Sequence, residues 1–141
     1  MAQDTQYGGF WVRVVALTLD NAVVFLILLA MGISLVTIKA AVGIELPYIL
    51  VSLPFALIPL FYWPLLESSS WQATIGKRIM GLVVTDLDGN RLSFLRALLR
   101  SLAKIISSIP FGIGFLIAAF TARKQALHDI IVKTLVVRTG P

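Results

Sequence analysis

The chain has 141 residues, of which 58% are hydrophobic and 13% are charged, and its formal net charge is +5. Soluble domains are about 45–50% apolar and about 25% charged, so this composition is typical of a membrane protein. It excludes a disordered chain, a fibre and an ordinary soluble enzyme. The length fits one domain over residues 1–141, and the absence of cysteine excludes disulfides and thiolate metal sites.

The charges divide the chain into two unlike halves. Residues 1–66 carry two basic and three acidic side chains, a net charge of −1, whereas residues 67–141 carry ten basic and four acidic ones, a net charge of +6. With so much apolar side chain, this basic excess favours anionic lipid headgroups over nucleic acid as the partner.

The first predicted element is a transmembrane helix over residues 14–36. About 20 apolar residues span the hydrocarbon core of a bilayer, and this stretch contains a single ionisable residue, Asp20. The stretch is too long for a cleaved signal peptide and has no basic region before it, so we expect it to remain in the mature protein.

A second span is predicted over residues 46–66, although it contains Pro54, Pro59 and Pro64, which have no backbone N–H to donate. Each proline leaves a carbonyl without its helical partner, and in lipid such a group needs another donor. Two interpretations remain open: a packed, kinked helix with Ser52 as a local donor, or a broken helix that lines a cavity.

A third apolar stretch, residues 98–120, is ambiguous. The basic residues Arg96, Arg100 and Lys104 fall on one helical face opposite a leucine-rich face, a pattern typical of a helix in the membrane interface. Helix-breaking residues follow over 110–114.

The positive-inside rule decides how that stretch is placed. The loop 67–94 and the tail 123–141 are both basic, so we expect both on the cytoplasmic side together with the N-terminus. This predicts two spans plus a re-entrant or interfacial helical hairpin over about 95–122, with a third span as the alternative.

A small sheet completes the predicted fold, an all-α integral membrane protein with a minor β element. Residues 79–85 are rich in β-branched side chains and precede an Asp-Gly turn at 86–90, which predicts a β-hairpin. Residues 134–138 could add a third strand on the cytoplasmic side.

Asp20 is the strongest candidate for a functional group. A carboxylate inside a span costs at least about 2.5 kcal/mol, so it should face protein or water and have a partner. We expect it to be neutralised by a proton or by a nearby side chain, and it serves either as a structural clasp or as an ion or proton site. The supporting candidates are Asn21, Ser52, Arg100 and Lys104.

The remaining polar candidates lie in the basic half. His128 beside Asp129 is either one end of a proton relay or a surface histidine, and a single histidine excludes a multi-histidine metal site. No metal or cofactor site is predicted. Basic side chains expected to meet lipid headgroups are Lys77, Arg78, Arg96, Arg123 and Lys124.

Three linked motifs resemble the RDD family of bacterial membrane proteins. They are Phe10-Trp11-Val12-Arg13 with Asp20, Thr74-Ile75-Gly76-Lys77-Arg78 with the later Asp-Gly turn, and Gln125-Ala126-Leu127-His128-Asp129. The resemblance implies that Arg13, Asp20 and Asp129 are the signature residues of the family. It also implies a multi-pass protein of the bacterial inner (cell) membrane that transports unidentified ligands, with sodium/proton exchange in some members.

Two functions follow as expectations. The first is transport, such as exchange of protons against monovalent cations at Asp20, by a homo-oligomer or together with a partner, since two spans enclose little volume. The alternative is a non-transporting interaction or assembly protein whose basic cytoplasmic face binds anionic lipid. The chain has no nucleophile elbow and no histidine pair, so an enzyme is not expected.

Overall fold

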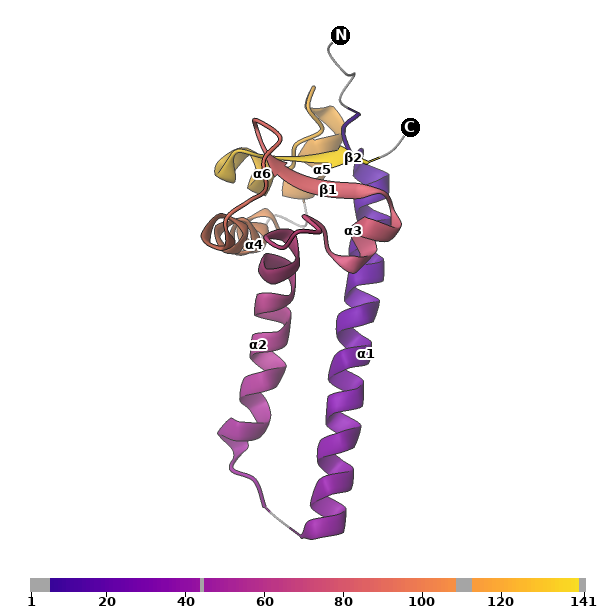
Figure 1. The fold of residues 1–141 in the computed structure, drawn as a ribbon, viewed down its shortest axis with the longest axis vertical. Helices are drawn as coiled ribbons and strands as arrows, with labels where there is room; N and C mark the ends of the chain where they lie inside the picture. The colour runs from indigo at the N-terminus through magenta and orange to yellow at the C-terminus, as the bar shows by residue number, and fades with distance from the viewer. Residues whose placement is uncertain (1–5, 44, 109–112, 140–141) are drawn as a thin grey trace.

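A computed structural model describes residues 6–43, 45–108 and 113–139 of the chain. Two long helices, α1 (Phe10–Val42) and α2 (Tyr48–Glu67), run side by side in opposite directions (Figure 1). Both are long and apolar enough to cross a membrane, which confirms the two predicted spans. Helix α1 extends beyond the predicted bounds at both ends and closes at Gly43, whose left-handed backbone donates its N–H to the Lys39 carbonyl.

Helix α2 continues without interruption through its three internal prolines. The broken-helix interpretation of this segment is therefore wrong, and the continuous, packed helix is the observed arrangement. Few side chains of either span are buried, and the buried ones gather towards one end of the helix pair, such as Asp20 in α1 and Glu67 in α2. The remaining surface of the spans is apolar and suited to lipid.

The rest of the chain forms a compact head, which we define as residues 68–108 and 113–139, at that end of the helix pair (Figure 1). Its elements are α3 (Ile75–Ile79), β1 (Leu82–Asp86), α4 (Phe94–Ser108), α5 (Ile113–Phe120), α6 (Leu127–Val132) and β2 (Thr134–Arg138).

Helices α4 and α5 correspond to the predicted hairpin. They have 15 and 8 residues, too few to cross a bilayer singly, and both lie in the head rather than alongside α1 and α2 (Figure 1). The third-span alternative is therefore wrong. The bend predicted at 110–114 falls mainly outside the described residues.

Strand β1 pairs in antiparallel fashion with β2, so that Leu82 lies opposite Arg138 and Asp86 opposite Thr134. The predicted strand at 134–138 is confirmed, but the predicted local hairpin is wrong. The turn after β1 forms, because the Asp86 carboxylate accepts the backbone N–H groups of Asp88 and Asn90. The chain then leads into α4 instead of returning as a neighbouring strand.

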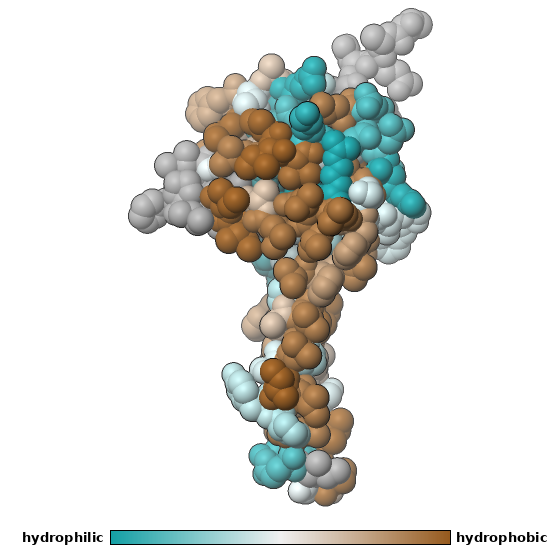
Figure 2. Space-filling model, turned by 90° about the vertical axis from the view of Figure 1, so that its left-hand side faces the viewer, coloured by the Kyte–Doolittle hydropathy of each residue, from teal (hydrophilic) through white to brown (hydrophobic). Residues whose placement is uncertain are grey.

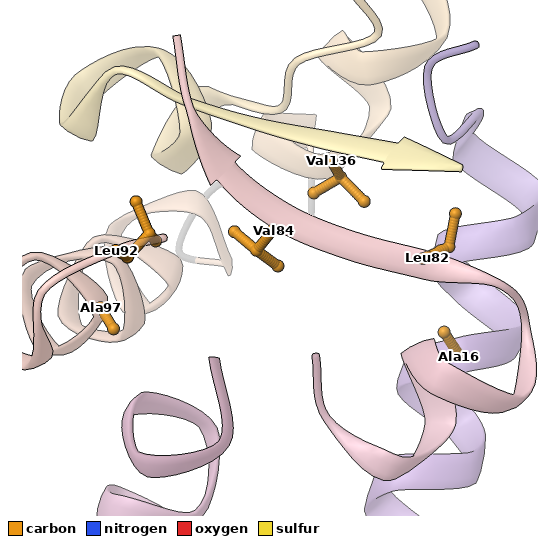
Figure 3. Packing of buried hydrophobic residues seen from close by; sticks show 6 residues of the cluster. All are labelled: Ala16, Leu82, Val84, Leu92, Ala97 and Val136. Carbon is orange, nitrogen blue, oxygen red and sulfur yellow. The ribbon is translucent and has the colours of Figure 1, made fainter. Parts of the chain in front are cut away.

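The sheet also fixes the start of α1. The backbone of Gly8 donates to the Val136 carbonyl at 2.8 Å, and Tyr7 forms a bridge with Val137. Side chains from α1, β1, β2 and α4 meet beneath the sheet in a small apolar core (Figure 3). The core residues are Ala16, Leu82, Val84, Leu92, Ala97 and Val136.

Candidate functional site

Helix α4 turns its basic face inward and its apolar face outward. Arg100 is only 1% exposed, whereas several apolar side chains of the same helix are strongly exposed. These exposed residues are Leu95, Leu99, Leu102, Ile105 and Ile106. The orientation is the reverse of that in a soluble protein, and it is stable where lipid covers the outer face. Figure 2 shows apolar surface that covers the spans and continues onto the head.

Arg100 is the centre of a buried group of charges that we call the charge cluster: Arg13, Glu67, Lys77, Arg100, Lys104 and Asp129. Its guanidinium bridges two carboxylates, with Nη1 2.6 Å from Glu67 Oε2 and Nη2 2.7 Å from Asp129 Oδ1. Its Nε also donates to Asp129 Oδ1 at 2.9 Å. The fork of a single arginine thus ties the end of α2 to α6.

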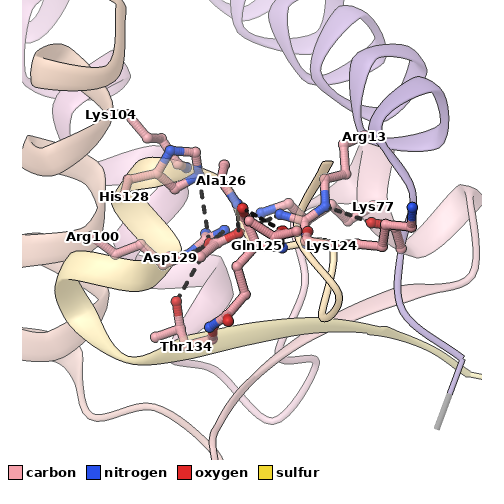
Figure 4. Close-up of polar contacts among 12 residues, drawn as sticks. Arg13, Lys77, Arg100, Lys104, Lys124, Gln125, Ala126, His128, Asp129 and Thr134 are labelled. Atoms are coloured by element: carbon pink, nitrogen blue, oxygen red, sulfur yellow. Dashed lines mark hydrogen bonds and ion pairs between the residues drawn. The ribbon is translucent and has the colours of Figure 1, made fainter. Parts of the chain in front are cut away.

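Arg13 connects α1 to the same group (Figure 4). Its guanidinium pairs with the Asp129 carboxylate and donates to the carbonyls of Gly8 at 2.8 Å and Lys124 at 2.6 Å. Lys124 adopts the left-handed backbone conformation, with φ of 50°, in the loop that carries this carbonyl. Asp129 also accepts the backbone N–H of Ala126, which stabilises the first turn of α6.

Glu67 receives the two lysines of the cluster. Lys77 from α3 pairs with its Oε1 oxygen, and Lys104 Nζ lies 3.3 Å from the same oxygen. Cations from three elements, α1, α3 and α4, therefore converge on two carboxylates, one at the end of α2 and one in α6. Among the described residues, no group of three or more His, Cys, Asp or Glu side chains could hold a metal ion.

Burial and the neighbouring charges shift the pKa values of the head residues. Burial lowers the pKa of Lys77 to about 7, although Glu67 favours its charged form. Burial likewise lowers the pKa of His128 to about 3, so this side chain is neutral near pH 7. Burial would raise the pKa of Asp129, but Arg100 and Arg13 hold it far below its usual range.

Asp20 lies apart from the charge cluster and binds neutral donors. Its Oδ1 accepts the Tyr62 hydroxyl at 2.9 Å and the Gly76 backbone N–H at 2.7 Å, and its Oδ2 accepts the Thr74 hydroxyl at 2.5 Å. The carboxylate is 1% exposed and thereby joins α1, α2 and α3. A β-carbon added to Gly76 would lie 2.1 Å from the Ala16 carbonyl oxygen, so only glycine permits this approach of α3 to α1.

Several sequence predictions about these residues need correction. Asp20 is not bound by the predicted partners, and Arg100 and Lys104 instead serve Glu67 and Asp129. Lys77 does not face lipid, because it is 8% exposed and paired with Glu67. His128 is not a surface residue: it is 3% exposed, and its Nε2 lies 3.5 Å from Asp129 Oδ1.

The signature residues and the remaining basic residues differ in their contacts. Arg13 and Asp129 meet directly, as two of the three signature residues, whereas Asp20 makes separate contacts. Arg78 is exposed and stacks on Trp71 at 4.8 Å, and Arg123 is exposed. The remaining basic side chains donate to backbone carbonyls, Arg96 to those of Val132 and Lys133, and Lys124 to that of Ala119.

Sequence reasoning missed Glu67, Tyr62 and Thr74. Glu67 carries a usable signal, since it is the first acidic residue after a long apolar stretch and a basic segment follows it. Tyr62 looks like an ordinary interfacial aromatic, and Thr74 has no feature in the sequence that pairs it with Asp20.

A cavity of about 320 Å³ lies beside the cluster. Its wall includes Arg13, Lys77, Arg100 and Lys104, and Asp20 borders it as well. Apolar side chains such as Phe10 and Leu116 form much of the remaining wall. A concave, mostly apolar site with a few charged groups is typical of a small-molecule site.

Comparison with known proteins places the chain in a family. The family model described as RDD family matches residues 7–133. The uncharacterized protein YxaI of Bacillus subtilis (strain 168) is 36% identical, over 92% of this chain and 96% of its own length. The uncharacterized protein YckC of the same strain is 33% identical, over 95% of this chain and 86% of its own. No solved structure matches the chain.

Proposed function

The chain belongs to the RDD family, and we propose that it is a transport protein of the bacterial cell (inner) membrane that exchanges protons against a monovalent cation at Asp20. The main observation behind this proposal is that the Asp20 carboxylate has no ion-pair partner among the described Lys and Arg residues. It is buried within a span and borders the cavity beside the charge cluster.

The surroundings of Asp20 suit both a proton and a hard cation. An ionised carboxylate without a counter-charge in a span is costly, and a bound proton or cation removes that cost. The hydroxyl oxygens of Tyr62 and Thr74 already lie within 2.9 Å of the carboxylate. Hydroxyl and carboxylate oxygens are hard ligands of the kind that bind small cations.

A pathway across the membrane would need more than one copy of the chain. Beyond Asp20, the described part of α1 presents few polar side chains, and the hydroxyls of Ser34 and Thr37 donate to carbonyls of their own helix. We therefore propose a homo-oligomer whose spans enclose the pathway jointly.

The proposed orientation places the head in the cytoplasm, since the basic segments 67–94 and 123–139 both belong to the head side. Cysteines introduced at Arg91 and Thr139 should be labelled by a membrane-impermeant reagent only after the cytoplasmic side is opened. Labelling of either position from outside intact cells would contradict this orientation.

Flux through reconstituted protein tests the proposed function. Purified protein in proteoliposomes with a pH-sensitive dye inside should move protons when a sodium or potassium gradient is applied. Asp20→Asn should abolish this movement and still fold, because the amide oxygen can accept from Gly76 and Tyr62 while its NH₂ group donates to Thr74.

Asp88→Asn is the matched control, since Asp88 is an exposed turn carboxylate and its loss should leave the flux unchanged. Full flux in Asp20→Asn would exclude Asp20 as the exchange site. No flux from folded wild-type protein would contradict transport itself and leave the non-transporting membrane role.

A further inference from the structure

The charge cluster carries more positive than negative charge. Its four cations, Arg13, Lys77, Arg100 and Lys104, face only two carboxylates, Glu67 and Asp129. Counting Asp20, which borders the same cavity, still leaves one positive charge unbalanced whenever Lys77, whose pKa burial lowers to about 7, is protonated. Buried charge without a counter-charge is costly, so an anion in the cavity would stabilise this arrangement.

Lys104 is the cation with the weakest partner inside the cluster. It shares Glu67 Oε1 with Lys77, at a longer distance of 3.3 Å, and its Nζ lies 5.6 Å from the centre of the Trp63 ring. The Lys104 ammonium has three N–H donors, so it can also donate to an oxygen of a ligand.

A second cavity, of about 440 Å³, adjoins the first. Both walls include Leu17, Trp63, Lys104 and Phe115, so Lys104 stands where the two cavities meet. The second wall also contains the Ser101 hydroxyl, which is buried and has no hydrogen-bond partner among the described residues. Ser101 and Lys104 are three residues apart on α4, so they share one face of this helix.

The second cavity opens towards the region that the bilayer would occupy. Three apolar residues of its wall, Leu60, Leu102 and Ile105, are 40%, 42% and 59% exposed. They belong to a span and to the outward face of α4, both of which lie against lipid in the arrangement described above. A ligand that combines an anionic head with an apolar chain matches the two cavities together.

We propose that the two cavities bind one anionic phospholipid from the leaflet on the head side. Its phosphate would contact Lys104 near Lys77 and Arg13, Ser101 would donate to a headgroup or ester oxygen, and an acyl chain would lie along Leu60 and Ile105. The proposal does not rest on exchange at Asp20, although Asp20 borders the first cavity, and the site differs from a diffuse basic surface because its charged groups are buried.

Native mass spectrometry of the purified protein, titrated with phosphatidylglycerol or phosphatidylcholine, tests this site. Wild-type protein should bind one phosphatidylglycerol in preference to phosphatidylcholine. Lys104→Gln should weaken this binding about tenfold, as expected for the loss of one charged hydrogen bond, whereas Lys104→Arg should largely preserve it. Arg123→Gln is the matched control, because it removes one exposed positive charge outside both cavities.

Equal binding of the two lipids, or equal weakening by Lys104→Gln and Arg123→Gln, would overturn the proposal. Displacement of the bound lipid by inorganic phosphate alone would also overturn it, since the site would then recognise a free anion. Asp20→Asn should bind phosphatidylglycerol at least as tightly as the wild type, because it removes a negative charge from the wall of the first cavity. A failure of exchange and a failure of lipid binding are therefore separately observable.

Discussion

The spans and the head place their polar and apolar groups in opposite ways. Along α1 and α2, many apolar side chains are exposed and few are buried. In the head, charged side chains such as Arg100 and Asp129 are among the most buried, and apolar side chains of α4 are exposed. The spans therefore depend on their surroundings for stability, whereas the head depends on internal ion pairs and hydrogen bonds.

The two regions also differ in whether one chain satisfies all of its own contacts. The charge cluster joins five elements, α1, α2, α3, α4 and α6, through paired charges and needs no second chain for those contacts. The two spans leave an apolar groove between them, lined by residues such as Phe25, Gly32 and Phe55. Substitutions in the two regions should therefore have very different effects on the isolated protein.

The largest effect is expected for Glu67→Gln, which removes the shared partner of Lys77, Lys104 and Arg100. Loss of one member of a buried ion pair leaves uncompensated charge, so the free energy of unfolding should fall by about 3–5 kcal/mol. Denaturant unfolding in detergent, followed by circular dichroism, measures it. Glu45→Gln, at an exposed pair with Lys39, should change little. Equal effects would show that the cluster does not hold the head together.

Gly76→Ala should have the next largest effect. The new β-carbon would overlap the Ala16 carbonyl and force α3 away from α1, at a cost of about 1–3 kcal/mol or more. Gly9→Ala is the control, because nothing lies within 4 Å of a β-carbon there. The melting temperature of the two variants compares them, and an unchanged value for Gly76→Ala would contradict the close approach.

Acid should destabilise the head through His128. Its pKa is about 3 in the folded protein and ordinarily 6.5, so the unfolded chain takes up the proton first as the pH falls. Stability should therefore decline between about pH 6.5 and pH 3, by up to about 1.4 kcal/mol per pH unit. The lowered pKa of Asp129 adds a loss in the same direction at lower pH. Unfolding of His128→Gln measured at several pH values should show a flatter profile, and an unchanged slope would contradict this origin.

The smallest effect is expected on the spans. Ile33→Leu changes a side chain that is 57% exposed, and the free energy of unfolding of the single chain should change by less than about 0.5 kcal/mol. Cross-linking of the same variant reports its oligomeric state. A large loss of stability that depends on protein concentration would place Ile33 at a contact between copies.

The length of the apolar stretches and the distribution of charge along the chain predicted much of this fold. Which strands and side chains pair with one another was harder to predict. The spans followed from apolar length, and the shared side of the two basic segments followed from charge. The local hairpin prediction was wrong because the turn at Asp86–Asn90 is compatible with any continuation, and β1 pairs instead with a strand near the other end of the chain. A strand shows its partner in its sequence only weakly.

The candidate site shows the same limit. The sequence identified Arg13, Asp20 and Asp129 as candidates. It did not predict their partners: Arg13 pairs with Asp129, whereas Asp20 accepts from Tyr62 and Thr74. Lys77 was misassigned because a basic side chain near a span ordinarily faces headgroups. Lys77 points inward only because the tertiary fold places Glu67, at the end of α2, beside it.

The pairing of Arg13 with Asp129 joins residues 116 positions apart. Ribosomes synthesise α1 before they reach Asp129, so the arginine of this helix lacks that carboxylate until 116 further residues have been added. The backbone N–H of Gly8 likewise lacks its acceptor until Val136 of β2 has been synthesised. Completion of the head therefore requires Asp129 and β2, and a chain truncated before Asp129 would retain both spans but leave Arg13 without its ion-pair partner.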